Sequence, residues 1–414
     1  MTGKQNAPVI RFEGFTDPWE QRKLGEFSKK KTTKNADGAL SETFTNSAEQ
    51  GVISQLDYFD HDITNDANIS GYYVVQPDDF VYNPRISATA PCGPINRNRL
   101  NRAGVMSPLY TVFSADSSVD KTYLEHYFKT SRWHAFMFLE GNSGARSDRF
   151  SISDATFFEM PIWCPEISEQ MAIAKQLETA DSLITLHQRK YDKLCTVKKS
   201  MLDKMFPKPG ETEPEIRFEG FTDPWEQRKL GSIAASFDYG LNAAATEYDG
   251  QNKYLRITDI DDATHEFLKS DLTTPLADLA MSADYLLEEG DLLFARTGAS
   301  VGKTYLYRQY DGTVYFAGFL IRARIGESAD PEFVYQATLT DAYKKYVAIT
   351  SQRSGQPGVN AQEYADYQLM LPSRTEQQQI GMTLRSLDNL ITLHQRKLEL
   401  LRNIKKSLLD RMFV

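Results

Sequence analysis

The chain has 414 residues, enough for two to four domains that each bury a core of their own. Its three cysteines, Cys92, Cys164 and Cys195, form no close pair, which argues against a disulfide framework and against a zinc site. A net charge of −9 argues mildly against nucleic acid as a partner, although an acidic chain can still carry basic patches. The N-terminus has no signal-peptide core and no apolar run reaches the length of a membrane span, so we expect a cytoplasmic protein with no membrane partner.

Two segments of the chain occur twice. Ile10–Gly25 reads IRFEGFTDPWEQRKLG and is repeated letter for letter at Ile216–Gly231. Leu183–Phe206 returns in closely similar form at Leu390–Phe413, whereas the text between the shared segments differs almost completely. A long internal repeat decides the architecture. We therefore predict a pseudo-two-fold molecule with two different inserts. Because the inserts differ, we expect the two ends of the molecule to recognise different ligands.

The two inserts have a mixed α/β pattern. Apolar and β-branched runs broken by Gly, Asn and Pro predict strands at 71–76, 79–82, 105–113, 253–257, 291–294, 304–307 and 314–325, with short helices at 121–130 and 331–346. The stretch Asp79–Tyr82 is similar to Asp291–Phe294, and 142–144 is similar to 353–355, at comparable distances from the helix that follows. The inserts therefore read as two diverged copies of one fold.

A long helical pattern follows each insert. Apolar residues recur at alternating steps of four and three from Ile173 to Met201 and from Ile380 to Leu408, which is the seam pattern of a coiled coil. A helix of roughly 38 residues is about 57 Å long and cannot bury such a stripe alone. We predict that the two helices pair antiparallel. Ser373 with Glu376 fits a capping box at the start of the second helix.

These patterns predict an α/β (α+β) fold with two globular domains joined by two long antiparallel coiled-coil helices. We expect the first domain at 1–165, the first helix at 166–206, a Pro-rich linker at 207–215, the second domain at 216–372 and the second helix at 373–414.

Two motifs are similar to known catalytic or cofactor-binding sequences. Gly298–Thr304 is similar to a phosphate-binding P-loop, but only three residues separate its glycines and the next residues read as a strand. A basic glycine loop lying against a nucleic-acid backbone fits better, with a plain tight turn as the alternative. Asp17-Pro-Trp19 and Asp223-Pro-Trp225 are similar to a methyltransferase motif but lack its second proline, so we favour packing or docking.

The histidines predict no metal centre. His187 and His394 occupy equivalent positions in the helical stripes, where each is better explained as a hydrogen-bonded histidine of the seam than as a metal ligand. The remaining histidines do not have the spacing of metal ligands. The sequence also contains no convincing Ser/His/Asp or Cys/His order of the kind used in nucleophilic catalysis. We therefore expect no catalytic residue, no metal and no cofactor in this chain.

Basic and amide side chains are the candidate contacts for a nucleic acid. In the first insert they are Lys30, Lys31, Arg97, Arg99, Arg102, Arg146 and Arg149; in the second they are Arg256, Arg296, Ser300, Lys303, Arg353, Ser354 and Gln356. For any one cluster, a solvated surface is the alternative. Arg296 and Gln356 have the reach and bidentate geometry for base edges, whereas Lys303 follows a glycine and suits phosphate.

With these features the chain resembles the specificity subunit of type I restriction–modification enzymes. The resemblance rests on the alternation of variable and shared segments, on the Pro-x-x-x-Glu-Gln starts of both helices and on their Leu-Ile-Thr-Leu-His-Gln-Arg-Lys stretches. Gly290–Lys303 and Ser354–Gly358 look like pieces of the target-recognition domains of that family. The resemblance covers essentially the whole chain.

The resemblance implies a non-catalytic DNA reader. Each recognition domain would read one half of an asymmetric bipartite site in double-stranded DNA, and the helices would set the spacing. Two modification subunits would bring S-adenosylmethionine and methylate adenine at N6, while two restriction subunits would bring ATP and Mg for cleavage. The residues expected to dock these subunits are His187, Arg189, Lys190, His394, Arg396 and Lys397.

Three alternatives stay open at this point. One is the specificity subunit of a related, fused restriction–methylation system. Another is a coiled-coil adaptor with two protein-binding modules and no nucleic acid. The third is a self-contained methyltransferase or nuclease, against which the missing cofactor loop and the missing carboxylate cluster argue.

Overall fold

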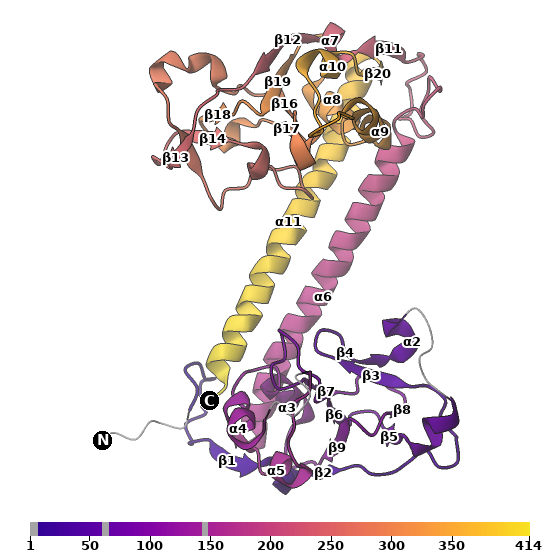
Figure 1. Cartoon of the computed structure of the whole chain (residues 1–414), viewed down its shortest axis with the longest axis vertical. Helices are drawn as coiled ribbons and strands as arrows, with labels where there is room; N and C mark the ends of the chain where they lie inside the picture. Colours follow the sequence, from indigo (N-terminus) through magenta and orange to yellow (C-terminus); the bar gives the residue numbers. More distant parts are fainter. Residues whose placement is uncertain (1–6, 60–65, 143–147) are drawn as a thin grey trace. The chain divides into compact units, whose positions relative to one another are not determined.

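The computed structural model describes residues 7–59, 66–142 and 148–414 (Figure 1). The chain forms two compact units. Unit 1 comprises Met1–Leu186 together with Leu398–Val414, and unit 2 comprises His187–Lys397. Each long helix, α6 (Ile167–Lys204) and α11 (Arg374–Met412), therefore begins in one unit and ends in the other.

In its described residues, unit 1 contains a sheet of four antiparallel strands in the order β2-β9-β6-β7. Their bounds are β2 (Ser28–Lys30), β9 (Thr111–Ala115), β6 (Phe80–Tyr82) and β7 (Ile95–Arg97). Two-stranded pairs accompany it: β1 (Glu20–Lys23) with β10 (Pro161–Cys164), β3 (Phe44–Ser47) with β4 (Gly51–Ser54), and β5 (Tyr73–Val75) with β8 (Gly104–Met106). The short helices are α1 (Leu24–Phe27), α2 (Gln55–Tyr58), α3 (Lys121–Tyr127), α4 (His134–Glu140) and α5 (Asp154–Phe158).

Unit 2 contains the corresponding sheet in the order β12-β19-β16-β17. Its strands are β12 (Ala234–Tyr239), β19 (Leu320–Ile325), β16 (Asp291–Ala295) and β17 (Thr304–Leu306). The accompanying pairs are β11 (Glu226–Lys229) with β20 (Gln368–Leu371), β13 (Ala245–Glu247) with β15 (Thr273–Pro275), and the parallel pair β14 (Lys253–Leu255) with β18 (Val314–Phe316). The short helices are α7 (Leu230–Ile233), α8 (Pro331–Ala337), α9 (Asp341–Thr350) and α10 (Ala361–Ala365).

The two units are copies of one fold. Their sheets match strand for strand along the chain, and β1 with β10 pairs as β11 does with β20. The runs predicted as single strands at 105–113 and 314–325 are each interrupted by a turn. In the first, Pro108 cannot donate a ladder hydrogen bond; in the second, Leu320 N turns back to Ala317 O (2.8 Å). The predicted helix at 331–346 also divides, because Thr340 caps a new helix.

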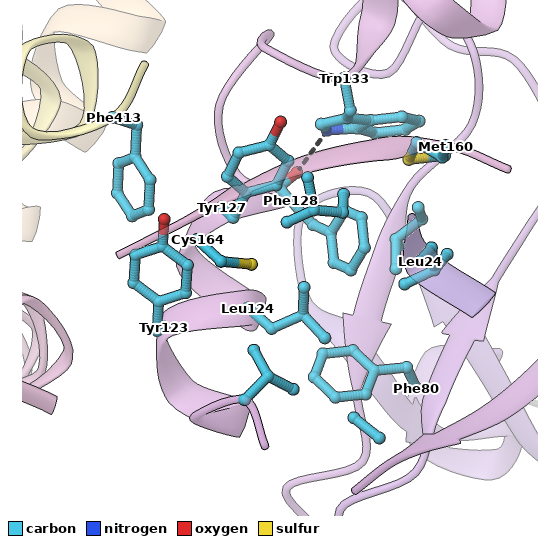
Figure 2. Packing of buried hydrophobic residues seen from close by; sticks show 14 of the residues in the cluster. Leu24, Phe80, Tyr123, Leu124, Tyr127, Phe128, Trp133, Met160, Cys164 and Phe413 are labelled. Carbon is cyan, nitrogen blue, oxygen red and sulfur yellow. Dashed lines mark hydrogen bonds between the residues drawn. The ribbon is translucent and has the colours of Figure 1, made fainter. Parts of the chain in front are cut away.

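Each core includes the end of the helix that started in the other unit. In unit 1, the ring of Phe413 packs 5.2 Å from that of Tyr123, in a core that contains Phe80, Tyr127 and Trp133 (Figure 2). In unit 2, Phe206 packs 5.2 Å from Phe333 and 6.3 Å from Trp225. The repeated Met-Phe at the end of each helix thus supplies core residues.

The shared frame begins with an ion pair that is the same in both units. Arg11 Nε lies 2.7 Å from Glu169 Oε1, and Arg217 Nε lies 2.7 Å from Glu376 Oε1. Both glutamates are fully buried at the start of a long helix. Half of the predicted capping box forms: Ser373 Oγ accepts from Glu376 N at 3.4 Å, but the Glu376 carboxylate accepts from Arg217 instead of from Ser373 N.

The glutamine that follows each of these glutamates fixes a neighbouring helix. Gln170 Oε1 accepts from Asp120 N (2.9 Å) and Gln377 Oε1 accepts from Asp330 N (2.8 Å). Asp120 and Asp330 are in turn the N-caps of α3 and α8. The repeated Glu-Gln therefore connects each long helix to its globular unit.

The first shared segment meets the end of a long helix in each unit. Ile10 N donates to Arg411 O (3.0 Å) in unit 1, and Ile216 N donates to Lys204 O (2.8 Å) in unit 2. In unit 2 the residues that make this contact are connected by the linker predicted at 207–215.

The long helices run antiparallel. In unit 2, His187 contacts His394 and Lys198 pairs with Asp388, so the partner number falls as the first number rises. In unit 1, Asp181 pairs with Lys405. The fold class expected from the sequence, mixed α/β units with two long antiparallel helices and an internal repeat, is confirmed. Among the described residues, no helix is both long enough and apolar enough for a membrane crossing.

Candidate nucleic-acid interface

Two loops of unit 2 that are distant in sequence lie against each other. The loop between β16 and β17 meets the loop between α9 and α10 through an antiparallel bridge of Thr297 with Gly358. Val359 N donates to Arg296 O (2.9 Å) and Gly298 N donates to Pro357 O (3.0 Å). These two loops contain Arg296 and Gln356, the residues that the sequence analysis proposed as base contacts. The structure therefore brings those candidates to one surface.

Glycine is required where the two loops cross. Gly298 has φ +71°, and a Cβ there would lie 2.8 Å from Gln356 Nε2. The missing side chain leaves room for the amide of Gln356 beside the backbone of the neighbouring loop. Gln356 is exposed, as is Ser354 two residues before it. Both predicted contacts are therefore open to a ligand.

Between residues 216 and 372, Arg296 is the arginine without an ion pair. Its guanidinium lies 5.1 Å over the ring of Tyr239, an attractive cation–π contact that leaves the donors without a carboxylate. Every other arginine of 216–372 is in an ion pair. Arg296 N donates to the carbonyl of Phe319, whose side chain is 56 % exposed. A guanidinium without a carboxylate partner thus lies over the exposed ring of Tyr239.

Lys303 lies below this surface. Its Nζ donates to Ile260 O (2.9 Å) and pairs with Asp262 (2.5 Å), and only 12 % of its side chain is exposed. The Asp262 side chain is 91 % exposed, so the ion pair is accessible for exchange. The phosphate role of Lys303 stays a prediction that requires this exchange. Ser300 is half-buried, and its carbonyl accepts from Lys303 N to close the turn (3.0 Å).

Two further candidates in unit 2 hold their own loops together. Arg353 donates to Glu363 Oε1 (2.5 Å) and to Thr350 O (2.7 Å). Arg256 grips Asp259 with two hydrogen bonds of 2.8 Å. A DNA contact by either arginine would have to replace a carboxylate partner, which lowers its net benefit.

Three arginine candidates of unit 1 are likewise committed to glutamates. Arg97 is buried with Nε 2.9 Å from Glu125 Oε2, and Arg99 contacts both Glu125 (2.8 Å) and Glu178 (3.0 Å). Arg102 makes two hydrogen bonds of 2.7 Å with Glu42. These pairs neutralise the basic cluster that the sequence suggested around 97–102.

The remaining candidates of unit 1 are more dispersed. Lys30 pairs with Asp154, and Lys31 on the neighbouring position is half-buried. Arg149 lies in a backbone bridge with Arg85. Arg146 lies outside the described residues.

Arg85 is a candidate that the sequence reasoning missed. Phe150 N donates to Pro84 O (2.7 Å) and Ile86 N donates to Asp148 O (3.0 Å), the same pair of bonds that joins the two loops in unit 2. Pro84 therefore corresponds to Arg296, and Arg85 follows it. The similarity of Asp79–Tyr82 to Asp291–Phe294 was the signal that, extended a few residues, would have found Arg85.

The long helices present a different set of groups. His187 Nδ1 and His394 Nδ1 are 2.7 Å apart, so each histidine is hydrogen-bonded in the seam as predicted, and its partner is the other histidine. Partial burial, His187 and the two nearby lysines lower the pKa of His394 below its ordinary value. Arg189, Lys190, Arg396 and Lys397 are exposed on the same helices. Their exposure is compatible with subunit docking.

The glycine motif at 298–304 does not build a P-loop. A short 3₁₀ turn, Gly298–Ser300, leads directly into strand β17 rather than into a helix whose first amides would cradle a phosphate. In the described part of the chain, no three His, Cys, Asp or Glu side chains are grouped to hold a metal ion. Trp19 and Trp225 of the Asp-Pro-Trp motifs are buried in the cores, as the packing interpretation expects.

Comparison with known proteins identifies the class. Residues 222–403 match the model of the type I restriction modification DNA specificity domain. The crystal structure of a type I restriction-modification system S subunit from M. genitalium has the same fold, with a TM-score of 0.61 at 15 % identity over 99 % of each chain. Residues 222–403 therefore belong to this family of DNA specificity domains. The resemblance to type I specificity subunits recognised from the sequence is confirmed.

A relative with a curated name is consistent with this class. The chain is 23 % identical over 276 residues to the type I restriction enzyme MjaVIII specificity subunit of Methanocaldococcus jannaschii. The match spans 62 % of this chain and 62 % of that protein.

Proposed function

We propose that the chain is the DNA specificity subunit of a type I restriction–modification complex. The observation that carries this proposal is the combination of one fold used twice with different surfaces. The first shared segment is identical in both units and makes the same ion pair, whereas the loops that contain Arg296 in unit 2 and Arg85 in unit 1 share no sequence. Two such units suit a bipartite site whose halves differ.

Base reading is assigned to free donors at the paired loops. A guanidinium binds guanine O6 and N7 with two hydrogen bonds, and a glutamine amide binds adenine N6 and N7. Arg296 and Gln356 have these groups without a carboxylate partner in the structure. Each good bidentate contact contributes about 1–3 kcal/mol of discrimination against the wrong base.

The chemistry is assigned to partner subunits. Methylation of adenine N6 requires a cofactor and extrusion of the base from the stack. In this proposal two modification subunits supply S-adenosylmethionine and dock on the long helices near Arg189, Lys190, Arg396 and Lys397. Two restriction subunits supply ATP-dependent translocation and cleavage with Mg. This chain is the non-catalytic reader and works in the cytoplasm.

The decisive experiment is a methylome. The chain is expressed with its modification subunit in a host that lacks adenine methylation of its own, and modified adenines are mapped by single-molecule sequencing. We expect one asymmetric bipartite motif that disappears when this chain is omitted. Methylation that persists without the chain would refute the proposal. A complex that assembles but shows no salt-dependent affinity for duplex DNA would favour the coiled-coil adaptor.

A further inference from the structure

The arginines of unit 1 differ sharply in how they are engaged. Among the described residues of 7–165, only Arg85 and Arg149 have a guanidinium with no ion pair and no hydrogen bond. The others bind carboxylates, hydroxyls or carbonyls within the unit: Arg11, Arg22, Arg97, Arg99, Arg102 and Arg132. The two free guanidinium groups lie on adjacent backbone segments, since Arg85 and Arg149 form a bridge.

Both free arginines line one cavity. It has a volume of about 490 Å³, and its wall also includes Asn83, Tyr110 and the exposed Leu109. Polar donors and acceptors, an aromatic ring and an apolar side chain therefore surround the two cations. Arg85 is exposed and Arg149 half-buried. Both guanidinium groups therefore lie on the wall of a solvent-accessible cavity.

The position of this cavity matches the reading surface of unit 2. The backbone bonds Phe150 N to Pro84 O and Val359 N to Arg296 O are equivalent in the two folds. Leu109 precedes β9 at the place where Phe319 precedes β19, and the two are 57 % and 56 % exposed. In both units, free guanidinium groups and one exposed apolar side chain thus lie where the same two loops cross, although Arg85 corresponds to Thr297 and Arg296 to Pro84.

We infer that this cavity is the base-reading surface of unit 1, with Arg85 and Arg149 as its guanine readers. The inference rests on the proposed function. Its occupant is the major-groove edge of one half-site, where a guanidinium can hold guanine O6 and N7 and Leu109 can contact a thymine methyl group. The half-site read by unit 1 therefore contains guanine. Arg97, Arg99 and Arg102, the candidates favoured by sequence, hold the unit together through Glu125, Glu178 and Glu42.

The test uses the full chain with its modification subunit and the same methylome readout. Arg85→Ala and Arg149→Ala are each expected to lower the preference for guanine at one position by about 10- to 100-fold. The positions read by unit 2 should keep their preference, which also reports that the variant is folded. Arg85→Lys keeps the charge but not the two-pronged geometry, and should relax the same position.

A matched control distinguishes the loss of a positive charge from the loss of a base contact. Lys23→Ala removes a cation that forms an exposed pair with Glu159 on the same unit, and it should leave the motif unchanged. Arg85 and Arg149 variants that keep the full wild-type motif would overturn the inference while leaving the proposed function intact. A wild-type chain that directs no sequence-specific methylation would instead remove the proposed function itself.

Discussion

His187 and His394 meet ring to ring, with their Nδ1 atoms 2.7 Å apart. One Nδ1 must donate and the other accept, so the contact requires at least one ring to be neutral. Lys190 and Lys397 lie close enough to oppose a positive charge on His394. The pair is identical in sequence context on both helices, and it makes the seam sensitive to protonation.

The first prediction concerns this pair. The pKa of His394 in the folded state lies below the ordinary 6.5, chiefly because of partial burial. The unfolded chain therefore binds the proton more readily. The folded state therefore has its full stability above pH 6.5, where His394 is neutral in both states, and loses stability as the pH falls below 6.5. His394→Asn should reduce the loss of stability between about pH 7 and pH 5, as measured by urea midpoints. An identical pH dependence in variant and wild type would contradict this role.

A second prediction concerns His126, which is buried in unit 1. Neither of its ring nitrogens has a hydrogen-bond partner among the described residues. Desolvation, assisted by Lys405 and Arg99, lowers its pKa to about 3. The folded state thus excludes the proton that the unfolded state takes up below the ordinary value of 6.5.

His126 should therefore cost about 1.4 kcal/mol of stability for each pH unit below that value, until the pH approaches the folded pKa. His126→Leu should flatten the pH dependence of the urea midpoint by about one proton. Urea titrations at several pH values measure this slope. If the leucine variant keeps the wild-type slope, another group dominates acid unfolding.

The third prediction concerns the ion pair at the start of each long helix. Arg11→Ala would leave the fully buried Glu169 without its counter-ion, which costs about 3–5 kcal/mol. Arg217→Ala should do the same to Glu376 in unit 2. Chemical unfolding measures both losses. Arg228→Ala is the control, since its pair with Glu226 is exposed and should contribute almost nothing. Equal, small effects for all three variants would show that the buried pairs do not stabilise the frame.

The fourth prediction separates the two proposed roles in unit 2. Arg296→Ala should weaken binding of the assembled complex to its cognate duplex by about 1–3 kcal/mol and relax one half-site only. Lys303→Ala should weaken binding to all sequences alike and reduce the salt slope by about one unit. Fluorescence anisotropy on cognate and scrambled duplexes at several salt concentrations measures both. Equal losses on both duplexes for Arg296→Ala would remove it from the readers.

The fold was predictable because its signals are periodic or repeated. The four-and-three spacing of apolar residues placed the long helices at 166–206 and 373–414, and the structure has them at Ile167–Lys204 and Arg374–Met412. The internal repeat likewise indicated two copies of one fold. Periodicity cannot detect a turn inside an apolar run, which is why 105–113 and 314–325 read as single strands.

The candidate site was predictable only in part, because a sequence shows charges but not their partners. Arg99 is 26 residues from Glu125 and 79 from Glu178, so nothing local indicated that both would hold it. Arg296 and Gln356 were correctly placed on loops, but their meeting depends on a backbone bridge between distant segments. Arg85 has no other basic residue close to it in the sequence. It became a candidate only when the loops of unit 1 were matched with the equivalent loops of unit 2.

The contact of Ile10 N with Arg411 O repeats that of Ile216 N with Lys204 O. In the second case a short Pro-rich linker connects the two sides; in the first they are separated by nearly the whole chain. Each unit therefore makes this contact in the same way, and the chain could begin at either of the two places. A copy of segment 207–215 inserted between residues 414 and 7, with the original linker opened, would give a circular permutant in which every contact of both cores is retained.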